Sequence, residues 1–225
     1  LGFEDWLSAC FGYGLVLAEL YALVVLLFGY VQTAWPLRRK PHPLSDTPAA
    51  WPTVDVVIPT YNESLDIVRL SIFAAQAMDW PADKLRVHVL DDGRRDEFRQ
   101  FCADIGVNYL TRDDNQHAKA GNLNHALGVT DSELIAIFDC DHVPVRSFLQ
   151  LTVGWFLKDA KLALVQTPHH FFSPDPFERN LGSFRRRPNE GELFYGLIQD
   201  GNDMWNAAFF CGSCAVLRRT ALESI

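Results

Sequence analysis

The sequence is poor in cysteine and carries no excess of positive charge. Its five cysteines are an odd number without the spacing of a disulfide scaffold, so we expect reduced thiols in a cytosolic compartment. Cys211 and Cys214 have the C-x-x-C spacing of redox and zinc sites, but no second such pair exists, and neither site is favoured. The formal net charge of −8 argues against wrapping of nucleic acid, so no nucleic-acid partner is expected.

Apolar residues, by contrast, are abundant. They make up 48% of the chain and aromatic residues 12%, which excludes a disordered protein. A length of 225 residues is enough for one or two domains with a substantial core. No internal repeat is visible.

Charge is nearly missing from the first 37 residues. Glu19 is the one charged residue between positions 6 and 37, and residues 20–37 contain none. A bilayer core needs about 20 apolar residues in a helix, so we expect a transmembrane helix within residues 1–37, in contact with membrane lipid. The alternative is a buried helix of a soluble protein. The basic run 38–40 follows at once, which predicts that the rest of the chain is cytoplasmic and argues against a cleavable signal peptide.

A second composition begins after a Pro-rich linker, residues 38–52. From residue 53 to 225, short β-branched runs alternate with helical patterns. The pattern predicts an α/β domain with a mostly parallel sheet and helices on both faces. We expect Asn62 to cap the first helix and Gly106 to end the second. The expected strands are 53–59, 84–93, 107–110, 133–138, 162–166 and 214–219, and the expected helices are 64–78, 96–106, 119–127 and 146–157.

Polar clusters follow three of these strands. They are PTYNE after the first, DDG after the second and DCD after the fourth. Ligands of open α/β sheets bind at the carboxyl ends of the strands, so these clusters should meet at one edge. Five acids in one cleft would repel each other, and a divalent cation, Mg²⁺ or Mn²⁺, is the simplest remedy. The acids are Glu63, Asp91, Asp92, Asp139 and Asp141.

Lys119 fits the same site. It stands at a helix start, just before Gly121, where a positive charge and free backbone N–H groups favour phosphate. The DCDHV run also satisfies the D-x-D-x-[TV] pattern of haloacid dehalogenase-type phosphatases. In those enzymes the motif follows the first strand, whereas here it follows the fourth, so this alternative is disfavoured.

Taken together, six motifs resemble one family. They are VVIPTYNE, VLDDG, HAKAGNLNHAL, FDCDHVP, QTPHHFFSPDPFERNL and FFCGSCAVLRR. The combination is similar to the catalytic subunits of bacterial cellulose synthases, processive family-2 glycosyltransferases with a GT-A fold. The resemblance implies an inner-membrane enzyme, multi-pass in full, that transfers glucose from UDP-glucose to β-1,4-glucan. It also implies a periplasmic membrane-anchored synthase subunit as partner.

The resemblance also implies roles for individual residues. Asp91 and Asp92 would be catalytic-site acids on the uracil and ribose side. The UDP-sugar would contact Thr60, Tyr61, Glu63, Lys119, Asp139 and Asp141, with Tyr61 stacking on the base. The metal would be held by Asp139, Asp141 and His142. The glucan acceptor would lie near Phe210, Cys211, Gly212 and Ser213.

Two later family motifs are absent from these residues. T-E-D, which carries the general base, and Q-x-x-R-W, which holds the acceptor, do not occur. Further membrane helices and a C-terminal domain that senses cyclic di-GMP are also absent. We therefore expect an inactive fragment, since losing a positioned base costs a factor of about 10² to 10⁴. A chitin or hyaluronan synthase and a non-catalytic nucleotide-binding fragment stay open as alternatives.

Overall fold

The computed structural model describes residues 2–224, which form two compact units. Among the described residues, the first contains 2–39 and 169–208, and the second contains 40–168 and 209–224. The predicted boundaries after residues 37 and 52 stay predictions. The candidate functional residues, 60–142 and 210–213, all belong to the second unit.

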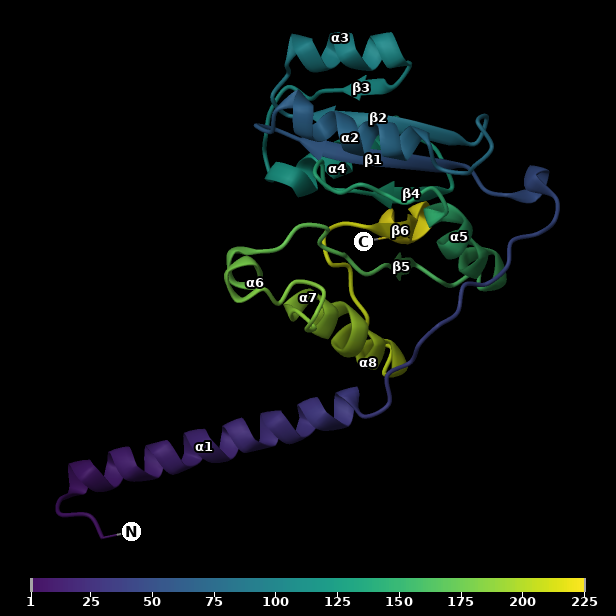
Figure 1. The fold of residues 1–225 in the computed structure, drawn as a ribbon. Helices are drawn as coiled ribbons and strands as arrows, with labels where there is room; N and C mark the ends of the chain where they lie inside the picture. Colours follow the sequence, from purple (N-terminus) through teal and green to yellow (C-terminus); the bar gives the residue numbers. More distant parts are fainter. Residues whose placement is uncertain (1, 225) are drawn as a thin grey trace. The chain divides into compact units, whose positions relative to one another are not determined.

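The second unit is built on a six-stranded sheet with the order β3-β2-β1-β4-β6-β5. Strands β1 to β4 are parallel, whereas β6 runs antiparallel to both β4 and β5. The prediction of a mostly parallel α/β sheet is confirmed, and Figure 1 shows β6 between its two neighbours. The strands are Val54–Thr60 (β1), Leu85–Asp91 (β2), Asn108–Leu110 (β3), Leu134–Ile137 (β4), Leu164–Gln166 (β5) and Ala215–Arg218 (β6).

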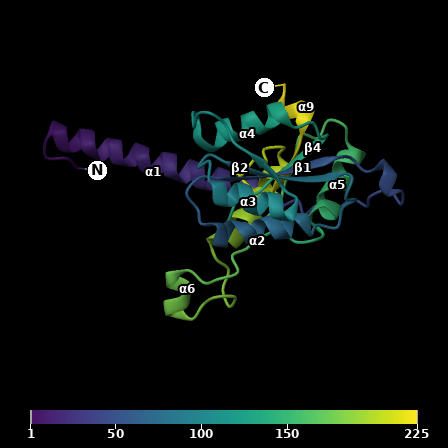
Figure 2. The same cartoon turned by 90° about the horizontal axis from the view of Figure 1, so that it is seen from above.

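Helices cover both faces of the sheet, as Figure 2 shows from above. Strand residues alternate between the two faces, so Val54, Val56 and Ile58 pack in the larger core with α2, α3 and α5. Val57 faces the opposite side and packs in a smaller core with α4 and α9. The helices of this unit are Leu65–Gln76 (α2), Asp96–Ile105 (α3), Ala118–Val129 (α4), Phe148–Lys158 (α5) and Arg219–Leu222 (α9), with a 3₁₀ turn at Pro48–Ala50.

The two predicted helix caps have different outcomes. Gly106 ends α3 in the left-handed conformation at φ 71°, as expected for a C-terminal glycine. The prediction for Asn62 is wrong, because the N-cap of α2 is Ser64 and no side chain caps that helix. In the turn before the helix, the Tyr61 amide instead donates to the Glu63 carboxylate at 2.9 Å.

The first unit contains one long helix, α1 (Trp6–Thr33). All its described residues are exposed or half-buried, and by length and composition it could cross a membrane. The Asp5 carboxylate caps it by accepting a bond of 2.7 Å from the Ser8 amide. The unit also holds α6 (Pro176–Leu181), α7 (Glu190–Leu193), a π-helical turn (Phe194–Ile198) and α8 (Gln199–Met204). Gln32 of α1 hydrogen-bonds Asn202 of α8.

Candidate functional site

A cavity of about 320 Å³ lies at the carboxyl ends of β1 and β2. This is the edge where the polar clusters were expected to meet. The cavity is lined by Pro59, Thr60, Tyr61, Glu63, Asp92, Asn115, Ala118, Lys119 and Asn122. The structure therefore brings the first two clusters and the start of α4 together in one concave site.

The turn after β1 is held by Glu63. Its carboxylate accepts bonds from the Thr60 hydroxyl at 2.8 Å and the Tyr61 amide at 2.9 Å. Partial burial raises the pKa of Glu63, but these bonds outweigh burial and keep that pKa below its ordinary value. The charged Glu63 carboxylate thus holds this turn in place. The Tyr61 side chain stays 52% exposed at the rim of the cavity.

Asp91, the last residue of β2, is fully buried and does not line the cavity. Its oxygens accept bonds from the amides of Gly93 at 2.9 Å and Arg95 at 2.8 Å. The Arg95 guanidinium and the Tyr109 hydroxyl each lie 2.9 Å away. Burial, followed by this bond to Asp91, raises the pKa of Tyr109. The buried Asp91 carboxylate therefore holds the backbone of the turn after β2 in place.

Asp92 lines the cavity next to Asp91. Arg112 grips its carboxylate in a bidentate pair, with Nε and Nη2 each 2.7 Å from an oxygen. Both side chains are nearly buried, with 7% of Arg112 and 8% of Asp92 exposed. The bond to Asp92 raises the pKa of Arg112, so the guanidinium keeps its positive charge.

Lys119 lies in the first turn of α4 and connects two regions. Its ammonium bonds the Asp139 carboxylate and the Gly212 carbonyl, the latter at 2.6 Å. Because Lys119 also lines the cavity, it joins the cavity to the turn after β4. A cation in this place suits a phosphate group.

The turn after β4 gathers Asp139, Asp141 and His142. The imidazole nitrogens of His142 lie 4.0 Å from an Asp139 oxygen and 3.9 Å from an Asp141 oxygen. The Asp139 side chain is 39% exposed and the Asp141 side chain 68%. None of the three lines the cavity itself. They form an open acidic site beside it.

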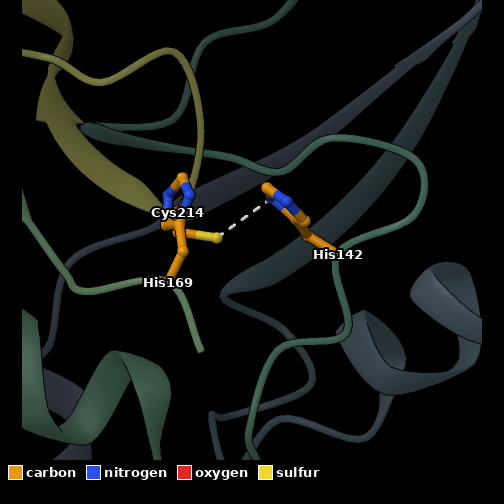
Figure 3. Close-up of side chains that lie close together, drawn as sticks. All are labelled: His142, His169 and Cys214. Carbon is orange, nitrogen blue, oxygen red and sulfur yellow. Dashed lines mark hydrogen bonds between the residues drawn. The ribbon is translucent and has the colours of Figure 1, made fainter. Parts of the chain in front are cut away.

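The segment 210–213 supports that turn. The Ser213 hydroxyl accepts a bond of 2.8 Å from the Asp139 amide and lies 2.8 Å from His142 Nδ1. The Cys214 sulfur lies 3.3 Å from the same nitrogen, and Figure 3 shows the two side chains pointing at one another. Burial raises the pKa of Cys214 to about 11, so its thiol stays protonated.

The other residues of this segment have different surroundings. Phe210 lines a second, apolar cavity of about 150 Å³ under α4. The Cys211 amide donates to the Gln166 side chain at 2.9 Å, and Gly212 has φ 87°. Ser213 is fully buried. The expectation that all four residues face an acceptor stays a prediction.

Sequence reasoning missed the basic partners of the acids. It expected a divalent cation to relieve repulsion among five acids, but three of them have protein cations as partners. Arg95 pairs with Asp91, Arg112 with Asp92 and Lys119 with Asp139. The arginines in DDGRRDE and LTRDDN, directly after the acids and before the lysine, were the available signal. Asn115 and Asn122, which also line the cavity, were missed as well.

Comparisons with known proteins agree with this architecture. Residues 55–225 match the family model of Glycosyl transferase family 2. The whole chain is 74% identical to the cellulose synthase catalytic subunit [UDP-forming] of Pseudomonas fluorescens (strain SBW25), of which it covers 30%. Over 95% of its length it is 65% identical to the corresponding subunit of Xanthomonas axonopodis pv. citri (strain 306), of which it covers 29%. The chain thus spans about 30% of the length of these curated relatives.

Solved structures share the fold. The mannosyltransferase PcManGT from Pyrobaculum calidifontis, in complex with GDP-Man and Mn²⁺, aligns with a TM-score of 0.63 at 23% identity. The alignment covers 93% of this chain and 56% of that one. Glucosyl-3-phosphoglycerate synthase from Mycobacterium tuberculosis, in complex with UDP, aligns with a TM-score of 0.53 at 23% identity, over 84% of this chain and 67% of that one. At these identities the likeness establishes the fold.

Proposed function

The chain belongs to glycosyl transferase family 2, and from this premise we propose that it forms the donor site of a processive, inverting glucosyltransferase. The full protein would transfer glucose from UDP-glucose to a growing β-1,4-glucan. The identity of 74% to a UDP-forming cellulose synthase subunit supports this assignment. The observation that carries it is the cavity that joins Tyr61, Asp92 and Lys119 at the carboxyl ends of two parallel strands.

The cavity suits the nucleoside end of the donor. The half-exposed Tyr61 ring would stack on the base, a contact that any base can make. Asp92 would accept bonds from the uracil or ribose, because it lines the cavity whereas Asp91 does not. Thr60 and Glu63 would fix the turn that carries Tyr61, and Asp91 would hold Asp92 in register from below.

Lys119 would bind the diphosphate, with its ammonium at the border between the cavity and the acidic turn. It would stabilise the charge that develops on UDP as the bond to the anomeric carbon breaks. The oxygen of an acceptor hydroxyl would form the new bond from the opposite face of the sugar as UDP departs, with the hydroxyl proton passing to a general base. Attack from that face inverts the anomeric centre. Phe210, Cys211, Gly212 and Ser213 would border the acceptor side.

The residues after β4 fit a hard divalent cation. The His142 imidazole lies 4.0 Å from an Asp139 oxygen and 3.9 Å from an Asp141 oxygen, and oxygen-rich donor sets suit Mg²⁺ or Mn²⁺. Asp139, Asp141 and His142 would hold the ion. When bound, it would supply positive charge for the diphosphate.

The proposed location is a bacterial inner membrane. Helix α1 would span it, with the basic run at 38–40 on the cytoplasmic side, together with the donor site. Protease accessibility in inverted vesicles tests this topology. Protection of residues after position 52 from a protease on the cytoplasmic face would contradict it. A periplasmic synthase subunit and further spans remain part of the proposal for the full protein.

The donor assignment is tested by calorimetric titration of the chain, kept in detergent, with UDP and ADP in the presence of Mn²⁺. We expect saturable binding of UDP and weaker binding of ADP, since Asp92 would pair with the uracil edge. Absence of UDP binding by a folded chain would refute the assignment. Equal binding of ADP would show that the cavity holds a diphosphate without selecting the nucleoside.

A further inference from the structure

Arg112 holds together the three segments that build the cavity. Its guanidinium pairs with Asp92 at the end of β2 through two bonds of 2.7 Å. The same group donates to the Gln116 carbonyl at 2.6 Å and to the Ala118 carbonyl at 2.9 Å. It therefore ties the acid of one cavity wall to the loop and helix start of the other wall.

The helix start that Arg112 grips has an unfavourable backbone. His117 has φ 59° and Ala118 has φ 44°, and neither is glycine. Residues with a Cβ rarely occupy this left-handed region, and two in succession need outside support. The two carbonyls bonded by Arg112 belong to Gln116 and Ala118, on either side of His117. The guanidinium thus stabilises the bend that aims the next residue, Lys119, toward the site.

Two further contacts belong to the same assembly. A Cβ atom at Gly121 would collide with the Gln116 carbonyl oxygen and with Arg112 Nη1, so only glycine lets the loop lie this close to α4. Asn115 donates to the Asp92 carbonyl at 3.2 Å and accepts from Arg94 at 2.8 Å. The loop 113–117 is therefore held through Asn115 and Gln116.

We propose that Arg112 is a positioning residue of the donor site, which sets Asp92 for the nucleoside and Lys119 for the diphosphate through one guanidinium. The inference rests on the proposed donor site and adds a residue that links its two halves. Arg112 is buried, so it acts through Asp92 and Lys119 and does not itself face the ligand.

A lysine at position 112 could not make the set of hydrogen bonds that Arg112 makes. A guanidinium bonds a carboxylate in parallel and still has N–H groups for two carbonyls, whereas an ammonium is a point charge with three donors. Arg112→Lys keeps the charge but loses the fork. If Arg112 served only to neutralise the charge of Asp92, the Arg112→Lys variant would bind UDP as tightly as the wild type.

The experiment compares UDP and CDP titrations, with Mn²⁺, of the wild-type chain, Arg112→Lys, Lys119→Met and the double variant. We expect Arg112→Lys to weaken UDP binding by about tenfold and to shrink the preference for UDP over CDP. Because the arginine acts partly through Lys119, its replacement in the Lys119→Met background should cost clearly less than in the wild type. Arg69→Ala, on the outer face of α2, is the control and should bind like the wild type.

Arg112→Ala gives a second readout. Removal of the side chain leaves space for a small guanidinium, so added ethylguanidinium should restore UDP binding to this variant and leave Arg69→Ala unchanged. If Arg112→Ala does not fold, the lysine variant and the double-variant cycle decide the matter alone. Wild-type affinity and base preference in Arg112→Lys, or additive losses in the cycle, would overturn the inference. Failure of the wild type itself to bind UDP would refute the donor site instead.

Discussion

Two acidic turns lie at the same edge of one sheet and differ in how their charges are satisfied. After β2, Asp91 and Asp92 are buried, and each is paired with an arginine at 2.9 Å or less. After β4, the side chains of Asp139 and Asp141 are 39% and 68% exposed. At the first turn an arginine holds each carboxylate and only Asp92 lines the cavity, whereas the second turn has more exposed acceptor oxygens within reach of a ligand.

The aspartates of the two turns therefore have different roles. A buried carboxylate held by several donors cannot move without leaving a charge unpaired, so it provides fixed geometry. An exposed carboxylate loses little when its partner changes, so it can exchange one cation for another. In the proposed donor site the nucleoside meets the rigid turn, and the diphosphate meets the adaptable one.

The largest expected contrast is in stability. Asp91→Asn leaves the partly buried Arg95 without its carboxylate, and we expect a loss of about 3 kcal/mol in the free energy of unfolding. Asp141→Asn changes an exposed side chain and should alter that free energy by less than about 0.5 kcal/mol. Urea unfolding followed by tryptophan fluorescence measures both. Equal effects of the two variants would remove the distinction between a rigid and an adaptable turn.

Metal-dependent binding of UDP, unlike stability, should be sensitive to a substitution in the exposed turn after β4. Asp141→Asn removes a charged candidate ligand, and we expect the UDP affinity measured with Mn²⁺ to fall by at least about tenfold. With a chelator present, the variant and the wild type should bind UDP alike. Asp131→Asn, in the exposed turn before β4, is the matched control and should keep wild-type affinity. An Mn²⁺-independent affinity in the wild type would remove the metal from the proposal.

Base selection should depend on the rigid turn. The Asp92 carboxylate can accept the uracil N3–H, which neutral cytosine lacks, so we expect UDP to bind about tenfold more tightly than CDP. Asp92→Asn should shrink that ratio. Tyr61→Ala should weaken both nucleotides by a similar factor, since stacking does not distinguish the bases. An undiminished ratio in Asp92→Asn would show that another group reads the base.

The smallest effect concerns thiols beside the two turns. Burial, and then the charge of Asp91, raises the pKa of Cys102 to about 11. Burial, and then the charge of Glu63, raises the pKa of Cys140 to about 12. Maleimide labelling of both should be slow and rise about tenfold per pH unit from pH 7 to 9, because the reactive thiolate is scarce. Peptide mass spectrometry gives each labelling rate, and a plateau below pH 9 would contradict the raised pKa values.

UDP with Mn²⁺ should slow the labelling of Cys140, which lies in the turn after β4, and leave the labelling of Cys102 unchanged.

Local patterns were sufficient to predict the elements of the sheet and the edge that carries the site. The β-branched run VDVVIPT is buried along its whole length and LRVHVLD over its last five residues, because these strands pack both faces into cores. The position of β6 could not be predicted in this way. Its pairing with Leu134–Ile137 joins residues about 80 positions apart, and nothing in AVLR specifies that partner.

The site was predictable to the same extent. Acids directly after strands indicate the edge, and Glu63, Asp92 and Lys119 line the cavity there, while their roles stay predictions. The basic partners of the acids were not predicted, since Arg112 lies 20 residues from Asp92 and meets it only through the fold. Asn62 failed as a cap for a related reason. The Glu63 side chain accepts a bond from the Tyr61 amide, and Ser64, not Asn62, is the N-cap residue of α2.

The place of β6 between β4 and β5 has a consequence for synthesis on the ribosome. Strands β4 and β5 emerge first, and about 50 further residues must follow before β6 can separate and pair them. At 5–20 residues per second this takes roughly 3 to 10 s, during which both strands present open edges. The residues made in that interval include 169–208, which belong with α1 in the other compact unit. The sheet can therefore be completed only after residues 169–208 have been translated. A nascent chain that stalls within this segment exposes the unpaired edges of β4 and β5 to chaperones and to neighbouring chains.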